Sequence, residues 1–288
     1  MKIAIYGSKR QQPVMAQLKD FLALLAERGD TVVMHGKLYR HLCEYIPEAL
    51  GVVSEVVEGP DFTADMAVSL GGDGTFLRTA MWVGDKELPI VGVNTGHLGY
   101  LAALSIDQLC SLPQLIADDC LRIESRSLIE VVEPELPEST GHFALNEVAI
   151  IKEESASMIQ AEVSLGDNRL ADYRADGLII CTSTGSTAYN LSVGGPIVAP
   201  TLDVNVISPV AAHSLSMRPL VVGADRTITI VPSGRARHVR LSLDGRSTLI
   251  DTGTSIMLRQ ARHKVLVLQL RDQTFADVLR DKLHWGDM

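Results

Sequence analysis

The first hundred residues alternate between two patterns of apolar positions. Four short apolar runs have the composition of buried strands: 2–6, 31–34, 66–70 and 89–93. Between the first two runs, apolar side chains recur at helical spacing: Val14, Leu18, Phe21, Leu22 and Leu25. Further helices are expected at 76–83 and at 37–50, although Pro47 limits how far the latter extends. Strands that alternate with helices in this way predict a parallel sheet with helices on its faces.

The pattern changes after residue 104. A helix is expected at 107–117, and short β-rich runs then follow one another: 127–132, 144–151, 159–165, 177–181, 204–207, 227–231, 239–243 and 255–258. The segments Gly166-Asp167-Asn168 and Asp244-Gly245 have the composition of hairpin turns. This part of the chain therefore predicts an all-β layer or sandwich.

The end of the chain returns to the first pattern, with a strand at 265–270 and a helix at 275–283. The simplest interpretation is that this tail rejoins the first domain. We therefore predict an α/β domain with a parallel sheet, made of residues 1–104 plus 262–288. Residues 105–261 are predicted to form a β-rich, sandwich-like domain.

Composition and charge narrow the class of protein. The 288 residues are 46% apolar and 21% charged, as in a globular protein. The net charge of −9 argues against a general nucleic-acid binder. No apolar run approaches the ~18 residues of a membrane span, and the N-terminal run is too short for a signal peptide. The four cysteines form no C-x-x-C pair, so we expect reduced thiols and a cytoplasmic location.

The sharpest local signal is the turn Gly71-Gly72-Asp73-Gly74-Thr75, between a predicted strand and a predicted helix. Glycines let backbone amides approach a ligand closely, and a helix start favours a phosphate group. A phosphate would repel Asp73 unless this carboxylate takes a proton from a hydroxyl nucleophile or organises Mg²⁺. The alternative is a tight turn in which Asp73 only caps the helix. The chain has neither a G-x-x-x-x-G-K-[ST] loop nor a complete G-x-G-x-x-G motif, which disfavours P-loop and ordinary dehydrogenase classes.

Two further segments are rich in polar groups. The apolar run 177–181 is followed directly by the hydroxyl and glycine residues 182–187, which suit a ribose, a phosphate or a base edge. The alternative is a loop that hydrogen-bonds to its own backbone. The pair Asn146-Glu147 lies within the β-rich run 144–151, where one of two adjacent polar residues usually faces solvent.

Taken together, these segments resemble the NAD kinase family. The matching stretches follow in the right order from about residue 66 to 246: GGDGT at 71–75, NTGHLGYL at 94–101, Asn-Glu at 146–147, DGLIICTSTGSTAYNLSVGGPI at 176–197, HSLSMRPLVV at 213–222 and Asp-Gly at 244–245. Two positions depart from the family pattern. Ser183 stands where most members have proline, and Arg246 stands where glutamine is frequent.

The resemblance implies a Rossmann-like α/β domain, a β-rich domain and a tail that rejoins the first. It also implies transfer of the γ-phosphoryl group of ATP, or of another donor, to the adenosine 2′-hydroxyl of NAD. Asp73 would then be the catalytic base. The phosphate path would be lined by the rest of the glycine turn: Gly71, Gly72, Gly74 and Thr75. The residues implied to bind NAD are Asp73, Gly74, Arg78, Asn146, Glu147, Arg174, Asp176, Thr187, Ala188, Tyr189, Asn190, Leu191, Ser192, Ala211 and Arg246.

Within that list, the resemblance assigns Asn146 and Glu147 to the adenosine, Arg174 and Asp176 to the nicotinamide ribose, and Arg78 to a phosphate. It further implies Mg²⁺ that arrives with ATP rather than at a fixed protein metal site. A homodimer or homotetramer built through the β-rich domain is expected, with NAD and ATP as substrates. Neither nucleic acid nor a membrane is expected as a partner.

Two other functions are compatible with parts of the pattern. Lipid kinases and phosphofructokinase-like proteins share the G-G-D-G turn, but they do not account for Asn146-Glu147 together with the T-G-S-T-A-Y run. A non-catalytic nucleotide sensor would keep the pocket and lose turnover, and the retention of Asp73 argues against it.

Overall fold

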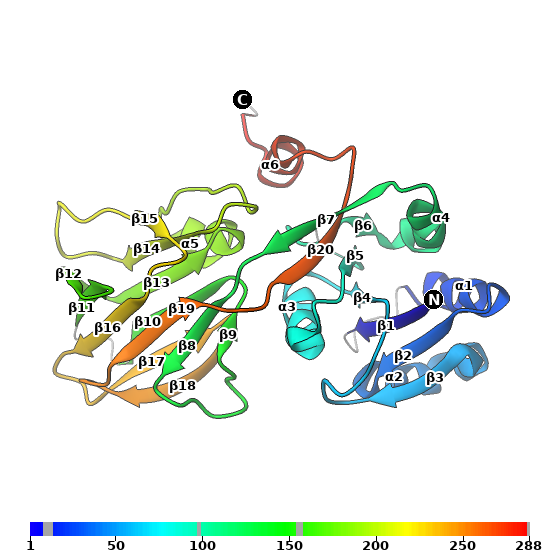
Figure 1. The fold of residues 1–288 in the computed structure, drawn as a ribbon, viewed down its shortest axis with the longest axis horizontal. Coiled ribbons are helices and arrows are strands. Elements are labelled where there is room, and N and C mark those ends of the chain that lie inside the picture. The colour runs from blue at the N-terminus through cyan, green and yellow to red at the C-terminus, as the bar shows by residue number, and fades with distance from the viewer. Residues whose placement is uncertain (8–13, 97–98, 154–157, 287–288) are drawn as a thin grey trace. The chain divides into compact units, whose positions relative to one another are not determined.

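The computed structural model describes residues 1–7, 14–96, 99–153 and 158–286 (Figure 1). The chain divides into two compact units. The first comprises Met1–Ser125 and Val265–Met288, and the second is Arg126–Lys264. The tail therefore belongs to the first unit, as the sequence predicted.

A parallel sheet forms the centre of the first unit, with the strand order β3-β2-β1-β4-β5-β20-β7. Its strands are β1 (Lys2–Gly7), β2 (Thr31–His35), β3 (Val53–Val57), β4 (Met66–Leu70), β5 (Ile90–Asn94), β7 (Leu121–Arg126) and β20 (Val265–Leu270), and the short β6 (Leu104–Ser105) pairs with β5. The pairings that join β3, β2, β1, β4, β5 and β20 are parallel. The order of strands reverses between β1 and β4, which makes this the switch point of a Rossmann-like sheet.

In the described part of the first unit, five helices accompany this sheet, and all but the last of them bury apolar residues. They are α1 (Met15–Glu27), α2 (Gly36–Tyr45), α3 (Asp73–Val83), α4 (Leu112–Ala117) and α6 (Phe275–Leu283), with 3₁₀ turns η2 (Pro47–Val52), η3 (Gly84–Lys86) and η4 (Ile106–Ser111). In α1, Leu18, Phe21, Leu22 and Leu25 are fully buried, so the spacing that predicted the helix is also its packing face. Gly29, with φ of +71°, lies just after the end of α1.

Two predicted helices are shorter than expected, and proline explains both differences. The helix predicted over 37–50 ends at Tyr45, because Pro47 cannot continue an α-helix and begins η2 instead. The helix predicted over 107–117 is divided into η4 and α4, and Pro113 lies in the first turn of α4, where proline is tolerated.

The second unit is a sandwich of two antiparallel sheets. One has the order β15-β14-β13-β10-β17-β18 and the other β12-β11-β16-β19-β8-β9. The elements of this unit are β8 (Ile129–Glu133), β9 (Phe143–Ala144), β10 (Glu147–Lys152), β11 (Ile159–Leu165), β12 (Asn168–Ala175), β13 (Gly177–Thr182), η5 (Thr184–Thr187), α5 (Tyr189–Ser192), β14 (Val204–Val210), β15 (Leu220–Gly223), β16 (Ile228–Ser233), β17 (His238–Leu243), β18 (Arg246–Asp251) and β19 (Ile256–Gln260). One buried cluster joins the sheets, with Ile150 and Leu241 from the first and Val163 and Ile230 from the second.

Both predicted hairpin turns are confirmed. Asp244 and Gly245 connect β17 to β18 with φ values of +49° and +80°, so both central residues are left-handed, as in a type I′ turn. Gly166, with φ of +56°, begins the turn between β11 and β12.

The boundary between the units differs from the predicted one. Residues 105–125 were assigned to the β-rich part, yet they lie in the first unit. Leu109 and Leu112 are fully buried in the core of that unit, and β7 pairs with β20. The sequence pattern predicts no strand at 121–126, so it does not show that this segment joins the first sheet.

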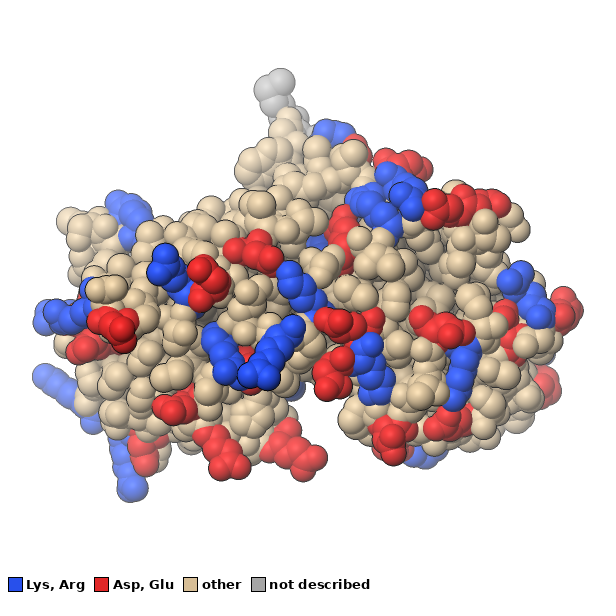
Figure 2. All heavy atoms as spheres, viewed as in Figure 1, with Lys and Arg blue, Asp and Glu red and all other residues tan. Residues whose placement is uncertain are grey.

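Charges of both signs share the surface. On the face drawn in Figure 2, basic and acidic side chains lie interspersed rather than in areas of a single sign. Within the described ranges, no helix combines the length and the apolar character that crossing a membrane requires.

Candidate active site

The glycine turn lies at the carboxyl end of β4, at the switch point of the sheet, where open α/β sheets bind their ligands. Gly71 adopts φ of +151°, and a Cβ there would lie 2.4 Å from Thr75 Oγ1, so a side chain is excluded. Gly72 and Gly74 are exposed. A Cβ on Gly72 would meet nothing within 4 Å, which leaves open space for a ligand beside its backbone.

Helix α3 begins at Asp73, three residues earlier than predicted, because the amides of Thr75 and Phe76 both donate to the Gly72 carbonyl. The N-cap is Gly72, and no side chain caps the helix. The interpretation of Asp73 as a mere cap is therefore wrong. The first amides of α3 still point out of the helix end, where they can bind a phosphate.

The Asp73 carboxylate is held by the chain segment that follows β5. Its Oδ2 accepts a hydrogen bond from the Tyr100 amide at 2.8 Å, and its Oδ1 accepts one from the Leu101 amide at 3.0 Å. A Cβ on Gly99 would lie 2.3 Å from Asp73 Oδ1, so glycine is required there. Part of the NTGHLGYL match thus positions the carboxylate, although His97 and the residue after it lie outside the described residues.

Arg78 lies one turn into α3 on its exposed side. Its Nη2 donates to Thr75 Oγ1 at 3.3 Å, and its guanidinium contacts the hydroxyl of Tyr6 in β1. Burial raises the pKa of Tyr6, and the neighbouring Arg78 acts in the opposite direction. Arg78 is therefore oriented by two neighbours while it remains accessible to a phosphate.

In the second unit, the Asn146-Glu147 pair is fixed by Asp244. The Asp244 carboxylate accepts hydrogen bonds from three consecutive amides, of Leu145 at 2.7 Å, Asn146 at 2.8 Å and Glu147 at 3.1 Å. Only 2% of its side chain is exposed. Burial raises the pKa of Asp244, and the three amides oppose that shift. The sequence identified Asp244 as a hairpin residue and as part of the family match, but its role in positioning the pair was missed.

The Glu147 carboxyl group is largely removed from solvent. Its Oε2 has no hydrogen-bond partner among the described residues, while the Tyr189 backbone donates to the carboxyl group. Burial, with a smaller contribution from Asp244, raises the pKa of Glu147 to about 7. A buried acceptor without a protein partner is costly to leave unbonded, so it points to a ligand hydroxyl or amide.

Residues 182–187 lie beside this pair because β10 and β13 are antiparallel neighbours, with Glu147 opposite Cys181. Thr182 Oγ1 donates to the Leu145 carbonyl at 2.6 Å and accepts from the Gly185 amide at 3.1 Å. A Cβ on Gly185 would lie 2.1 Å from the Asn146 carbonyl oxygen, which only glycine avoids. The hydroxyl-rich loop and the Asn-Glu pair therefore form one cluster, which we call the β10 cluster.

Several polar side chains of the loop hydrogen-bond to the loop's own backbone or to neighbouring backbone, which agrees with the alternative interpretation of residues 182–187. Ser183 Oγ donates to the Leu202 carbonyl, and the φ of −57° at this residue is one that proline also adopts. The Asn190 amide donates to the carbonyls of Ser186 and Pro196 and accepts from Ser208 Oγ at 2.6 Å. Asn190 is fully buried, so its predicted contact with NAD finds no support in its side chain.

The remaining residues of this loop offer more to a ligand. Thr187, Ala188 and Leu191 are partly exposed, and Ser192 is exposed. Tyr189 exposes 40% of its surface beside Glu147, and an accessible aromatic ring can pack against a base.

Arg174, Asp176 and Ala211 form a second group, which we call the 176 corner. The Asp176 amide donates to the Val210 carbonyl at 2.9 Å, next to Ala211, which has φ of +49°. Asp176 Oδ1 accepts from Lys152 Nζ at 2.8 Å, and Arg174 is exposed. The 176 corner lies at the other end of β10 and β13 from Glu147, about 17 Å along the strands at ~3.3 Å per residue.

Arg246 binds its own surroundings. Its Nη2 donates to the Phe143 carbonyl at 2.5 Å and its Nε to the Leu243 carbonyl at 3.2 Å, and 28% of the side chain is exposed. These bonds hold the start of β18 beside β9. The structure thus gives Arg246 a structural role, and its contact with NAD stays a prediction.

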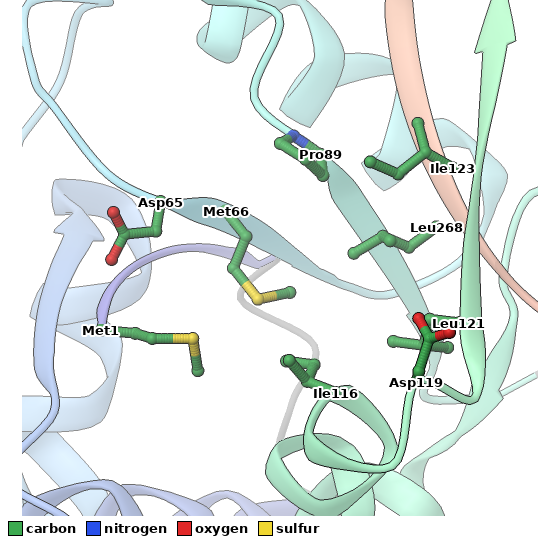
Figure 3. Close-up of a pocket in the computed structure, with 9 residues that line it drawn as sticks. All are labelled: Met1, Asp65, Met66, Pro89, Ile116, Asp119, Leu121, Ile123 and Leu268. Carbon is green, nitrogen blue, oxygen red and sulfur yellow. The ribbon is translucent and has the colours of Figure 1, made fainter.

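A cavity of about 260 Å³ in the first unit lies away from the glycine turn (Figure 3). It is lined by residues at the amino ends of β1, β4, β5 and β7 and by their neighbours: Met1, Asp65, Met66, Pro89, Ile116, Asp119, Leu121, Ile123 and Leu268. Because the glycine turn follows the carboxyl end of β4, this largely apolar cavity is not part of the candidate site. Among the described residues, no group of three His, Cys, Asp or Glu side chains is placed to hold a metal ion.

A Rossmann-like unit with a glycine turn at its switch point, joined to a β-sandwich that presents a polar loop, defines a nucleotide-binding protein of two units. The family model of the ATP-NAD kinase N-terminal domain matches residues 8–119, and that of the ATP-NAD kinase C-terminal domain matches residues 145–270. The chain belongs to the NAD kinase family.

Relatives and solved structures agree with this assignment. The NAD kinase of Porphyromonas gingivalis is 41% identical over 288 residues, which cover 99% of this chain and 98% of the relative. That of Geobacter sulfurreducens is 35% identical, with 99% of each chain covered. The fold is similar to yeast NADH kinase complexed with NADH, at a TM-score of 0.86 and 22% identity over 100% of this chain and 89% of the other. It is also similar to an NAD kinase from Archaeoglobus fulgidus in complex with ATP, at 0.73 and 23% over 99% and 98%.

Proposed function

We propose that this chain transfers the γ-phosphoryl group of ATP to the 2′-hydroxyl of the adenosine ribose of NAD. The observation that carries the proposal is the Asp73 carboxylate, which is fixed by the Tyr100 and Leu101 amides inside a glycine turn. In the reaction, Asp73 takes the proton of the 2′-hydroxyl while the oxygen of that hydroxyl forms a bond to the γ-phosphorus. The bond from that phosphorus to the bridging oxygen breaks, and ADP leaves with the electron pair.

The rest of the glycine turn would bind the phosphates of the donor. Gly72 and Gly74 present open backbone at the start of α3, and Arg78 adds a positive charge one turn further on. Such a site supplies position and charge neutralisation, which are the main needs of phosphoryl transfer.

We propose that Mg²⁺ enters with the nucleotide. Its ligands would be phosphate oxygens and water, with the Asp73 carboxylate as the protein group of suitable chemistry in the turn. When bound, the cation would neutralise charge on the phosphates. The glycine turn and Arg78 would hold the phosphates of ATP, and Asp73 would remove the proton of the 2′-hydroxyl.

The β10 cluster supports binding of NAD. The Oε2 of Glu147, which has no hydrogen-bond partner among the described residues, can accept a hydrogen bond from a ribose hydroxyl, and the exposed ring of Tyr189 can pack against a base. Asn146 lies beside them because Asp244 and Gly185 fix its backbone. We assign the adenosine end of NAD to this cluster and the nicotinamide ribose to Arg174 and Asp176.

We also propose a homodimer or homotetramer built through the β-rich unit, and a cytoplasmic location. The β10 cluster and the 176 corner lie at opposite ends of the same two strands. An assembly in which one copy presents the β10 cluster to the 176 corner of another would let both groups contact one NAD molecule.

The decisive experiment is a turnover assay with NAD, ATP and MgCl₂ in which NADP is separated and measured. Formation of NADP that depends on all three components supports the proposal. NAD binding without any product would instead identify a nucleotide sensor. Replacement of ATP by polyphosphate, and of NAD by NADH, in the same assay defines the donor and the acceptor.

A further inference from the structure

The peptide group between Gly99 and Tyr100 is bound by opposite charges at its two ends. Its N–H donates to the Asp73 carboxylate at 2.8 Å, and its carbonyl accepts a hydrogen bond from the Lys282 ammonium. Lys282 also donates to the Ala102 carbonyl at 3.2 Å. A cation and an anion on the two sides of one peptide group polarise it in the same sense, so each hydrogen bond strengthens the other.

Lys282 is placed for this contact by helix α6, which is distant in sequence from the loop. The helix is fixed at its start by a capping box, in which the Thr274 hydroxyl accepts a hydrogen bond from the Asp277 amide while Asp277 accepts one from the Thr274 amide. Lys282 and Gly99 are 183 positions apart, yet both lie in the first unit. The ammonium lies 5.9 Å from the centre of the Tyr100 ring, so it also contacts the residue whose amide reaches Asp73.

The ammonium group of Lys282 is partly withdrawn from solvent. Burial lowers the pKa of Lys282, whereas the charges of Asp73 and Asp281 raise it. Its hydrogen-bond acceptors among the described residues are two neutral carbonyls. A lysine without such a function would keep its ammonium in water, because withdrawing a cation from solvent costs free energy.

We propose that Lys282 is a positioning residue for Asp73. It fixes the Gly99–Tyr100 peptide so that the amides of Tyr100 and Leu101 both point at the carboxylate, and it keeps a positive charge behind that carboxylate. This inference rests on the proposed function, in which Asp73 accepts the proton of the 2′-hydroxyl. Without the lysine, the peptide can rotate and the carboxylate loses its fixed direction.

The test is Lys282→Met, which keeps an unbranched chain and removes the charge. We expect kcat to fall by about 10- to 100-fold, since small misplacements of catalytic groups cost factors of that order, with KM for NAD changed by no more than about threefold. Lys282→Arg, which keeps a cation and its donors, should recover most of the loss. Arg280→Met is the matched control on the same helix, because this exposed arginine pairs only locally, with Asp277, in the described structure.

A double-mutant cycle separates positioning from folding. In an Asp73→Asn background, Lys282→Met should cause little further loss of kcat, because its target is already gone. Equal losses in both backgrounds, or no recovery in Lys282→Arg, would assign the lysine to structure alone and overturn the inference. Wild-type kcat in Lys282→Met would overturn it as well. If the wild-type chain itself formed no NADP, the proposed function would fail first.

Discussion

At the scale of single residues, each unit has one carboxylate of interest, and the two have opposite surroundings. Asp73 is bound by two amides in a turn open to solvent, whereas Glu147 is largely removed from solvent and its Oε2 has no hydrogen-bond partner among the described residues. The first arrangement holds a carboxylate in a fixed direction, which suits a group that takes a proton from a substrate. The second suits a group whose protonation changes near neutral pH and whose Oε2 can accept a hydrogen bond from a ligand. Each leads to a separate prediction.

Asp73→Asn should abolish basicity while most of the side chain's shape is kept. We expect kcat to fall by about 10²- to 10⁴-fold, the usual contribution of general-base catalysis, with NAD affinity largely preserved. A larger loss, partly restored by added Mg²⁺, would show that the carboxylate also organises the metal. Because the asparagine amide would face the Tyr100 amide, melting curves must accompany the kinetics. Turnover close to wild type with an unchanged melting curve would remove Asp73 from the mechanism.

Glu147→Gln should change how stability depends on pH. The folded pKa of Glu147 is about 7 and its ordinary value is 4.5, so the folded state binds more protons than the unfolded state between those pH values. Stability from this group is therefore present below pH 4.5 and is lost as pH rises through 7, by about 3 kcal/mol. The variant lacks this loss, so it should melt above wild type at pH 8 and close to it at pH 4.5. Equal differences at both pH values would contradict the assigned pKa.

At the scale of elements, the sequence predicted what depends on local pattern. The spacing of Leu18 to Leu25 gave α1, and Asp244-Gly245 gave a hairpin turn that the structure confirms. What the sequence missed depends on contacts between distant positions. Neither β12 nor β7 is predicted as a strand: β12 is largely polar and lies at a sheet edge, and β7 pairs with β20, which is distant in sequence. Asp244 likewise contacts amides 97 to 99 positions away, which no local pattern encodes.

Asp244→Ala should test whether the β17–β18 hairpin carries the Asn-Glu pair. The substitution leaves three amides without their shared acceptor, and we expect it to cost about 3 kcal/mol or more of unfolding free energy. NAD binding should weaken at the same time, since the start of β10 loses its anchor. Asp251→Ala, at the exposed far end of the same hairpin, is the control and should change stability by under about 0.5 kcal/mol. Similar effects of both variants would show that the hairpin's contribution is not specific to Asp244.

At the scale of the whole molecule, each unit contributes a different part of the proposed reaction. The first carries the base and the phosphate-binding turn, and the second carries the β10 cluster and the 176 corner. The separation of those two groups along β10 and β13 makes assembly a functional question as well as a structural one.

Light scattering at micromolar concentration should give the mass of a dimer or a tetramer of the 31.2 kDa chain. We expect the assembly to persist on dilution, because the predicted interface is that of an obligate assembly and such interfaces are large. A mass that corresponds only to the monomer, measured on protein that still forms NADP, would show that one chain holds NAD by itself.

In the sequence, the second unit is inserted between the two segments of the first, and this order has a consequence for how the protein is synthesised. Strand β20 pairs with β5 in the first sheet, yet the ribosome synthesises it only after the whole of the second unit. The sandwich has all its strands while the first sheet still lacks one. N-terminal domains usually fold first during synthesis. Here the second unit is complete before the first, because the first unit still needs β20. Until β20 has been synthesised, the backbone groups of β5 that pair with it lack this partner, and a chaperone or a strand of another chain can bind there.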